Sequence, residues 1–174
     1  FTQTENVSID AKITDGENDT SYATMDITKI DTVPPTCGSA SGGKTTWSKN
    51  ENVTVSVGCT DTYGECSQST FSSTISGQGT TESKTITISD KAGNTANCTN
   101  TYNKYIDTTP PTCGNQHGGK TNWTTNQNVS VGVYCTDTFG ECAQSDYTTN
   151  ISGHGQTGTA SFTIADKAGN TTSC

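Results

Sequence analysis

Short runs in which every second residue is apolar recur along this chain. Valine occupies alternate positions from 53 to 57 and again from 129 to 133, with polar or small residues between them. An alternation with period two places one set of side chains on the same face of a β-strand. The pattern therefore predicts strands at 53–59 and 129–135, each with a valine face turned toward a core.

Further runs of this kind occur, and turn-forming residues separate them. Apolar residues alternate weakly at 71–75 and 147–151 and more clearly at 86–88 and 162–164. Aspartate and glycine lie between the runs, as is usual in tight turns. No stretch of useful length has the period of an amphipathic helix. These features predict an all-β fold of short antiparallel strands arranged as a β-sandwich.

One segment is repeated and divides the chain. Residues 31–37 read Asp-Thr-Val-Pro-Pro-Thr-Cys, and residues 107–113 read Asp-Thr-Thr-Pro-Pro-Thr-Cys. At this offset of 76 residues, about 40 of the 68 aligned positions are identical, without any insertion. Two successive prolines remove backbone donors and interrupt strand pairing. We therefore expect a first repeat at 31–106 and a second repeat at 107–174.

Residues 1–30 have the plan of the end of a repeat. Alternating residues at 9–13 lead to a turn rich in aspartate and glycine, and a polar run at 22–30 then reaches Asp31. The first repeat closes in the same way, with a turn at 90–95. We therefore expect 1–30 to be the last strands of a preceding, degenerate repeat. The second repeat stops before its last strand is complete, so we expect a segment cut from a longer array.

The composition indicates that each repeat needs disulfide bonds for stability. Only 28% of the residues are apolar, and serine and threonine make up about a third of the chain. A repeat of this size buries a thin core and needs additional stabilisation. Four cysteines at matching positions in each repeat indicate disulfides in an oxidising, extracellular setting. A zinc site is disfavoured because no Cys-x-x-Cys occurs. The cysteines are Cys37, Cys59, Cys66, Cys98, Cys113, Cys135, Cys142 and Cys174.

The charge and the apolar pattern argue against several functions. The net charge is −8 and the chain contains no arginine, which disfavours nucleic acid and anionic lipid as partners. No run approaches the roughly 18 apolar residues of a membrane-spanning helix. His117 and His154 have no counterparts in the first repeat, and no nucleophile motif is present. We therefore do not expect an enzyme.

Three signatures together resemble a known family. The chain has Asp-Thr-Thr-Pro-Pro-Thr at 107–112, Thr-Asp-x-x-Gly at 60–64 and 136–140, and Asp-Lys-Ala-Gly-Asn-Thr at 90–95 and 166–171. In these segments both repeats resemble the bacterial Ig-like repeats of long surface proteins and adhesins. The resemblance implies tandem Ig-like antiparallel β-sandwiches on the cell surface. Many repeats of that family lack cysteines, so these would form a disulfide-stapled variant.

The Ig-like topology that the resemblance implies gathers the four cysteines of each repeat at one end. The strands that begin at Cys37 and end near Cys59 are adjacent in this topology, which favours a bridge between them and leaves Cys66 to pair with Cys98. The alternative joins Cys37 to Cys98 and Cys59 to Cys66. The favoured pairing in the second repeat is Cys113–Cys135 with Cys142–Cys174.

Three aspartates of each repeat fall at the same end. Aspartate side chains commonly cap turns through their own backbone, and we favour this role for all of them. Clustered carboxylates are also what calcium requires, and repeats of the resembling family often hold calcium at linkers. Calcium is therefore the alternative, and no other cofactor is expected. The candidate ligands are Asp31, Asp61 and Asp90, and Asp107, Asp137 and Asp166.

Two further residue types are candidates for surface roles. Trp47 and Trp123 would offer a stacking platform for sugar, but we expect them to pack over the edge of the core or on a linker. Asn-x-Ser/Thr motifs would carry glycans in a eukaryotic or archaeal secreted protein. These motifs begin at Asn6, Asn18, Asn52, Asn97, Asn122, Asn128, Asn150 and Asn170.

Near-identical repeats joined by proline pairs favour a structural function. We expect spacer or shaft units of an extracellular surface protein or filament, whose main partners are neighbouring repeats. One alternative is an adhesin-type module that binds a glycan or host protein. Another is a filament subunit in which the strand at 22–30 completes the last repeat of another copy.

Overall fold

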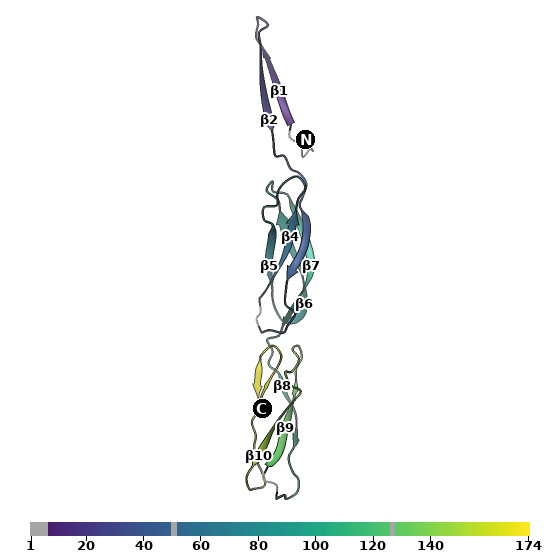
Figure 1. The fold of residues 1–174 in the computed structure, drawn as a ribbon, viewed down its shortest axis with the longest axis vertical. Helices are drawn as coiled ribbons and strands as arrows, with labels where there is room; N and C mark the ends of the chain where they lie inside the picture. Colours follow the sequence, from purple (N-terminus) through teal and green to yellow (C-terminus); the bar gives the residue numbers. More distant parts are fainter. Residues whose placement is uncertain (1–6, 50–51, 126–127) are drawn as a thin grey trace. The chain divides into compact units, whose positions relative to one another are not determined.

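The computed structural model describes residues 7–49, 52–125 and 128–174 (Figure 1). These residues form antiparallel β-sheets and contain no helix. The expected all-β fold is therefore confirmed, and the arrangement of the sheets is sandwich-like. None of the described residues belongs to a helix of the length and apolarity that crossing a membrane requires.

The described residues form twelve strands. The valine runs at 53–59 and 129–135 lie within β4 and β9, as the alternation predicts. In chain order the strands are β1 (Val7–Thr14), β2 (Thr20–Ile27), β3 (Thr36–Gly42), β4 (Val53–Thr60), β5 (Thr70–Ile75), β6 (Gly79–Ser89), β7 (Thr95–Ile106), β8 (Thr112–Gly118), β9 (Asn128–Thr136), β10 (Asp146–Ser152), β11 (Thr163–Ala165) and β12 (Thr171–Ser173).

Strands β1 and β2 form a hairpin. The carboxylate of Asp15 accepts hydrogen bonds from the backbone N–H groups of Glu17 and Asp19, both at 2.9 Å, and so caps the turn. Ile9 is paired with Met25 across the hairpin, which places both on one face. These side chains are 45% and 67% exposed. The hairpin therefore presents an apolar face that its own residues do not bury.

The first repeat contains two sheets with a core of alternating side chains. One sheet has the order β3-β4-β5, and the other pairs β6 with β7. Val55 and Val57 of β4 are fully buried, as are Ile88 of β6 and Ile106 of β7. The polar residues between them face outward, so the period-two pattern of the sequence becomes the inside and outside of each sheet.

The second repeat has the same plan with a shorter second sheet. Its first sheet has the order β10-β9-β8, and its second pairs β11 with β12 over three residues each. Between Cys113 and Gln116 the register of β8 on β9 shifts, and Gly114 in this segment lies close to the backbone of Tyr134. The buried core consists of Val133, Cys135 and Ile164.

Neighbouring Cα atoms group the chain into two units. The first comprises 1–41, 55–73 and 83–100, and the second comprises 42–54, 74–82 and 101–174. This division passes through the strands of the first repeat instead of falling at Asp107. The boundaries 1–30, 31–106 and 107–174 therefore stay a prediction from the repeated sequence.

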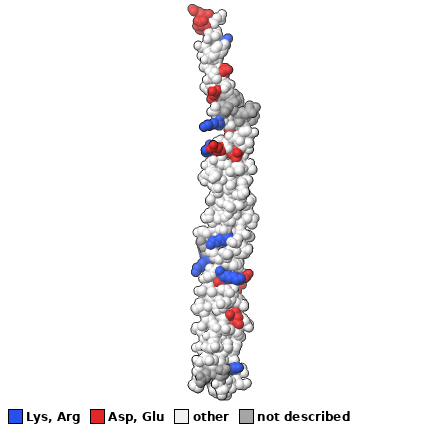
Figure 2. All heavy atoms as spheres, viewed as in Figure 1, with Lys and Arg blue, Asp and Glu red and all other residues white. Residues whose placement is uncertain are grey.

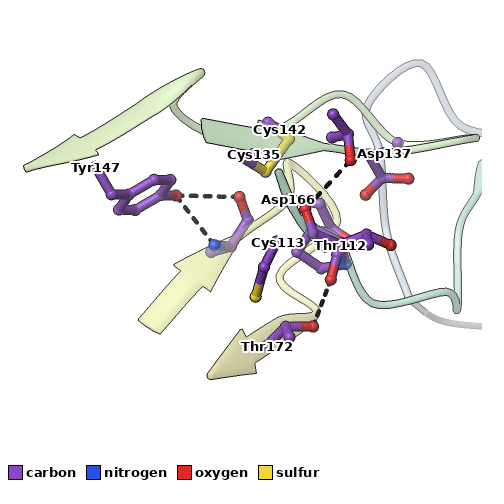
Figure 3. The surroundings of a disulfide bond; sticks show 12 residues. Thr112, Cys113, Cys135, Asp137, Cys142, Tyr147, Asp166 and Thr172 are labelled. Carbon is purple, nitrogen blue, oxygen red and sulfur yellow. Dashed lines mark hydrogen bonds between the residues drawn. A yellow bond between two sulfur atoms is a disulfide. The ribbon is translucent and has the colours of Figure 1, made fainter. Parts of the chain in front are cut away.

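The favoured disulfide pairing is wrong. The structure joins Cys37 to Cys98 and Cys59 to Cys66, and no described cysteine is free. The second repeat has the same pattern, with Cys113 bonded to Cys174. Its short bridge joins Cys135 to Cys142 (Figure 3).

The loop after β4 explains the error. The backbone N–H of Cys59 donates to the carbonyl oxygen of Ser69 at 3.1 Å, so the chain returns to the end of β4 after a short excursion. Cys66 lies in this excursion, with its Cα 6.1 Å from that of Cys59. Cys37 of β3 is thereby left to bridge to Cys98 of β7, which belongs to the other sheet. The long bridge joins the two sheets of the repeat.

We predict that the two bridges of a repeat stabilise it unequally. The Cys37–Cys98 bridge spans 61 residues and the Cys59–Cys66 bridge spans 7. In the chain-entropy model these loops contribute about 4 and about 2 kcal/mol. Thermal unfolding of the C37A/C98A and C59A/C66A double variants should therefore show the larger loss for the first. Equal losses, or a larger loss for the short loop, would contradict the entropic account.

Candidate metal centre

A closing turn positions the buried aspartate of each repeat. In the first repeat, Asp90 accepts hydrogen bonds from the backbone N–H groups of Gly93 at 2.7 Å and Asn94 at 2.8 Å. Gly93 has a φ of 98°, which residues other than glycine rarely adopt. The side-chain amide of Asn94 donates to the other carboxylate oxygen of Asp90 at 2.8 Å. Both oxygens of a carboxylate that is only 3% exposed are therefore bonded.

The asparagine of this turn also holds the segment that opens the repeat. Asn94 Nδ2 donates to the backbone oxygen of Asp31 at 3.2 Å. In the second repeat, Asn170 Nδ2 donates to Asp107 O at 3.0 Å and to Asp166 Oδ2 at 2.8 Å. One amide thus ties the end of a repeat to its beginning. This role was not predicted from the sequence, although the same asparagine occurs in both copies of the closing motif.

Asp31 and Asp61 cap turns with only one of their two oxygens. Asp31 Oδ1 accepts from the N–H of Val33 at 2.9 Å, and Asp61 Oδ1 accepts from the N–H of Tyr63 at 3.1 Å. The Oδ2 atoms of both residues are buried and have no hydrogen-bond partner. The turn-capping role that we favoured is present, and it leaves two carboxylate oxygens unpaired.

In the second repeat, the carboxylate of the first aspartate, Asp107, accepts hydrogen bonds at both of its oxygens. Asp107 is fully buried, and its Oδ1 accepts from the N–H of Thr109 at 2.8 Å and from Gln78 Nε2 at 3.0 Å. Its Oδ2 accepts from the N–H of Gly140 at 2.7 Å. A Cβ atom at Gly140 would collide with this oxygen, so any other residue there would displace the Asp107 carboxylate. Among the aspartates of this repeat, only Asp137 has a buried oxygen without a partner.

The structure brings each predicted set of aspartates together. One oxygen from each of Asp31, Asp61 and Asp90 lies within 4.8 Å of the others, and the oxygens of Asp107, Asp137 and Asp166 meet the same limit. Like charges at this separation repel one another, and partial burial strengthens the repulsion. A hard cation with oxygen ligands, such as calcium, would relieve it. The unpaired oxygens of Asp31 and Asp61 make the first cluster the better fit.

Hydrogen bonds hold the pKa of Asp90 below its ordinary value. Burial acts to raise this pKa, but the bonds from Asn94 and from the backbone of the turn outweigh burial and favour the ionised form. Nearby, the hydrogen bond and the charge of Lys91 lower the pKa of Glu65, and Lys167 has the same effect on Glu141. These exposed ion pairs tie the disulfide loop to the closing turn but add little stability.

The disulfide loop and the closing turn also meet through backbone bonds. The N–H of Lys91 donates to the carbonyl oxygen of Glu65 at 2.8 Å, and the N–H of Ser67 donates to that of Ser89 at 2.9 Å. In the second repeat, Tyr147 reaches the strand before the turn, where its hydroxyl bonds both the N–H and the carbonyl oxygen of Ala165 (Figure 3). The aspartates of each repeat therefore lie at an end of the sandwich-like fold that several hydrogen bonds hold together.

The other candidate residues lie apart from these clusters. Trp47 packs edge-on against Tyr105, with ring centroids 5.3 Å apart, as expected. Trp123 is 82% exposed, so the expectation that it packs over the core edge is wrong for the second repeat. His117 is hydrogen-bonded to Asp146 at 2.7 Å and stacks on Tyr134.

One glycosylation candidate is excluded by its contacts. Glycans attach to the side-chain nitrogen of asparagine, and this atom of Asn170 is engaged in the hydrogen bonds described above. Asn6 lies outside the described residues. The remaining candidates are exposed, namely Asn18, Asn52, Asn97, Asn122, Asn128 and Asn150.

Comparison with protein-family models gave no match, and neither curated proteins nor solved structures matched the chain.

We predict that calcium binds the first cluster and stabilises the protein. At a concentration 100-fold above its dissociation constant, a ligand of the folded state adds about 2.7 kcal/mol. Asp61→Asn keeps an oxygen to cap the turn but removes one charge. It should abolish the calcium-dependent rise in melting temperature, whereas Asp137→Asn should leave most of it. A melting curve that does not respond to calcium or chelator in the native protein would leave turn capping as the only role.

We predict a second effect at low pH. Because the pKa of Asp90 is lowered by folding, its ionised form stabilises the folded state above the ordinary pKa, and this contribution is lost as the pH falls through the folded pKa. Asn94→Ala removes one of the bonds responsible. An NMR titration should show the Asp90 pKa closer to its ordinary value in this variant, with acid unfolding at higher pH. Asn97→Ala, a control outside the turn, should change neither, and an unchanged Asp90 pKa in Asn94→Ala would refute this origin.

Proposed function

We propose that the two repeats are spacer units in the shaft of an extracellular surface protein or filament, built as tandem Ig-like domains. The four disulfides indicate an oxidising environment. Repetition of the same bridges, the same closing turn and the same aspartate cluster supports a modular role, because stability in such arrays is largely local to each repeat and its neighbours.

The surroundings of Asp107 carry this proposal. Its backbone N–H donates to Ser48 O at 3.0 Å, and its side chain accepts from Gln78 of the first repeat and from Gly140 of the second. Pro110 and Pro111 follow after two threonines, and their fixed φ angles restrict the chain there. A joint that is buried and bonded on both sides of the sequence boundary suits a spacer better than a flexible linker does.

The surface supports the same function. On the face drawn in Figure 2, lysine, aspartate and glutamate occur in small groups separated by uncharged surface. A hydroxyl-rich surface with little charge offers weak attraction for nucleic acid. The exposed aromatic side chains of the described residues are few and are spread along the sequence, whereas binding surfaces favour aromatic clusters; they are Tyr22, Tyr63, Trp123, Tyr134 and Phe139. Glycans on the exposed asparagines would add to the same extracellular role.

We predict that the disulfides limit how far the shaft extends under load. The bridge from Cys37 to Cys98 encloses 61 residues, and the bridge from Cys113 to Cys174 encloses the same number. Pulling on the ends by single-molecule force spectroscopy should extend only residues outside these loops. After reduction, each repeat should release roughly 210 Å more, at about 3.5 Å per residue.

Two results would count against the spacer function. Release of a full repeat without reductant would show that the long bridges do not bear load. Micromolar binding to one glycan in an array screen of the whole chain, lost on a single side-chain substitution, would favour the adhesin-type alternative. Comparison of Trp123→Ala with Trp47→Ala would then show whether the exposed tryptophan is responsible.

A further inference from the structure

The residue two positions before the first aspartate of each repeat has an unusual backbone conformation. Tyr105 has a φ of 41° and lies two positions before Asp107. Lys29 has a φ of 61° and lies two positions before Asp31. This left-handed region is unfavourable for residues other than glycine, because Cβ comes too close to the following carbonyl oxygen. Its recurrence at the same position indicates a feature of the junction that precedes a repeat.

A segment of the first repeat binds the chain at Tyr105. We call this segment, residues 43–49, the strap. The N–H of Ser48 donates to Tyr105 O at 3.0 Å, and Ser48 O accepts from the N–H of Asp107 at 3.0 Å. Earlier in the strap, the N–H of Lys44 donates to another β7 carbonyl oxygen at 2.9 Å. The strap therefore bonds the end of β7 and the residue that opens the second repeat.

Side chains of the strap add to this hold. Trp47 packs edge-on against the ring of Tyr105, with ring centroids 5.3 Å apart. Lys44 Nζ donates to Ser48 Oγ at 2.9 Å and so joins the two bonding residues of the strap to each other. Gly43 has a φ of 91°, and a Cβ atom there would lie 2.5 Å from a β7 backbone oxygen. The close approach of the strap to β7 therefore depends on this glycine.

The strap and the φ angle of Tyr105 depend on each other. A non-glycine residue stays in the left-handed region only where its surroundings hold it there. The two backbone bonds of Ser48 fix the chain just after Tyr105, and Trp47 fixes the side chain. Without these contacts, Tyr105 would return to the extended region that tyrosine favours in strands. The chain would then enter Asp107 from a different direction.

We propose that the junction before the second repeat is a preset kink, held at Tyr105 by the strap, and that release of the strap lets the junction bend. While the strap is bound, the junction is stiff, because Asp107 is fully buried and bonded. The strap also bonds the second repeat, since Lys49 Nζ donates to Gly169 O at 3.4 Å. This inference deepens the spacer function and rests on it for its use, which is a shaft with a stiff and a bending state at a defined position.

Two substitutions at one position test the kink. Tyr105→Asn and Tyr105→Thr both remove the ring that contacts Trp47. Asparagine tolerates the left-handed region, as Asn18 does with a φ of 69°, whereas a β-branched threonine does not. We expect the asparagine variant to melt a few degrees higher and to exchange the amide protons of Ser48 and Asp107 more slowly. At an ordinary strand position the order is the reverse, because threonine favours strands.

Asn103→Thr is the matched control, at an exposed position two residues earlier in β7. Because this residue is an ordinary strand position, the variant should melt no lower than the native chain. A Tyr105→Thr variant that melts as high as Tyr105→Asn, with equally protected amides, overturns the proposal.

Trp47→Ala tests the strap separately. We expect faster exchange of the Ser48 and Asp107 amides, and backbone amide NMR relaxation that gives the two repeats different rotational correlation times. In the native chain, and in Trp123→Ala, which removes a ring that is 82% exposed, the repeats should share one correlation time. If either change is absent in Trp47→Ala, the proposal is overturned. The force and glycan measurements still decide the spacer function on their own.

Discussion

The bridge between the two sheets is the constraint on which each repeat depends. A repeat of about 70 residues with few large apolar side chains cannot bury enough surface to hold two sheets together firmly. The bond from Cys37 to Cys98 joins β3 to β7, and so fixes one sheet to the other at the end where the aspartates gather. Because this bridge encloses most of the repeat, it lowers the conformational entropy of the unfolded chain more than the short bridge does.

The same end carries the polar contacts that define where a repeat begins and ends. Asn94 and Asn170 each bind the closing turn and the opening segment with one amide group. Their carboxylate partners, Asp90 and Asp166, are buried, and the hydrogen bonds that these carboxylates accept offset the cost of burial. In the first repeat two carboxylate oxygens stay unpaired, which is why the same end is also the candidate cation site.

Much of the fold was predictable from the chain, because local pattern determined it. The valine alternation predicted β4 and β9, and the repeated motifs predicted that Asp31, Asp61 and Asp90 would meet. The disulfide pairing was not predictable in this way. Both pairings place the cysteines at the same end, and the choice depends on how tightly the loop before Cys66 folds back to β4. The sequence also did not predict that 79–89 forms one long strand whereas 155–165 forms only a short one. Strand formation in this segment depends on a neighbouring strand with which it can pair.

Peptide mapping without reduction tests the central claim most directly. Protease digestion of the unreduced protein under conditions that prevent exchange should yield peptides that link Cys37 to Cys98 and Cys113 to Cys174, with Cys59–Cys66 and Cys135–Cys142 as short internal loops. Peptides that link Cys37 to Cys59 and Cys66 to Cys98 would contradict the account, because the bond between the two sheets would then lie elsewhere.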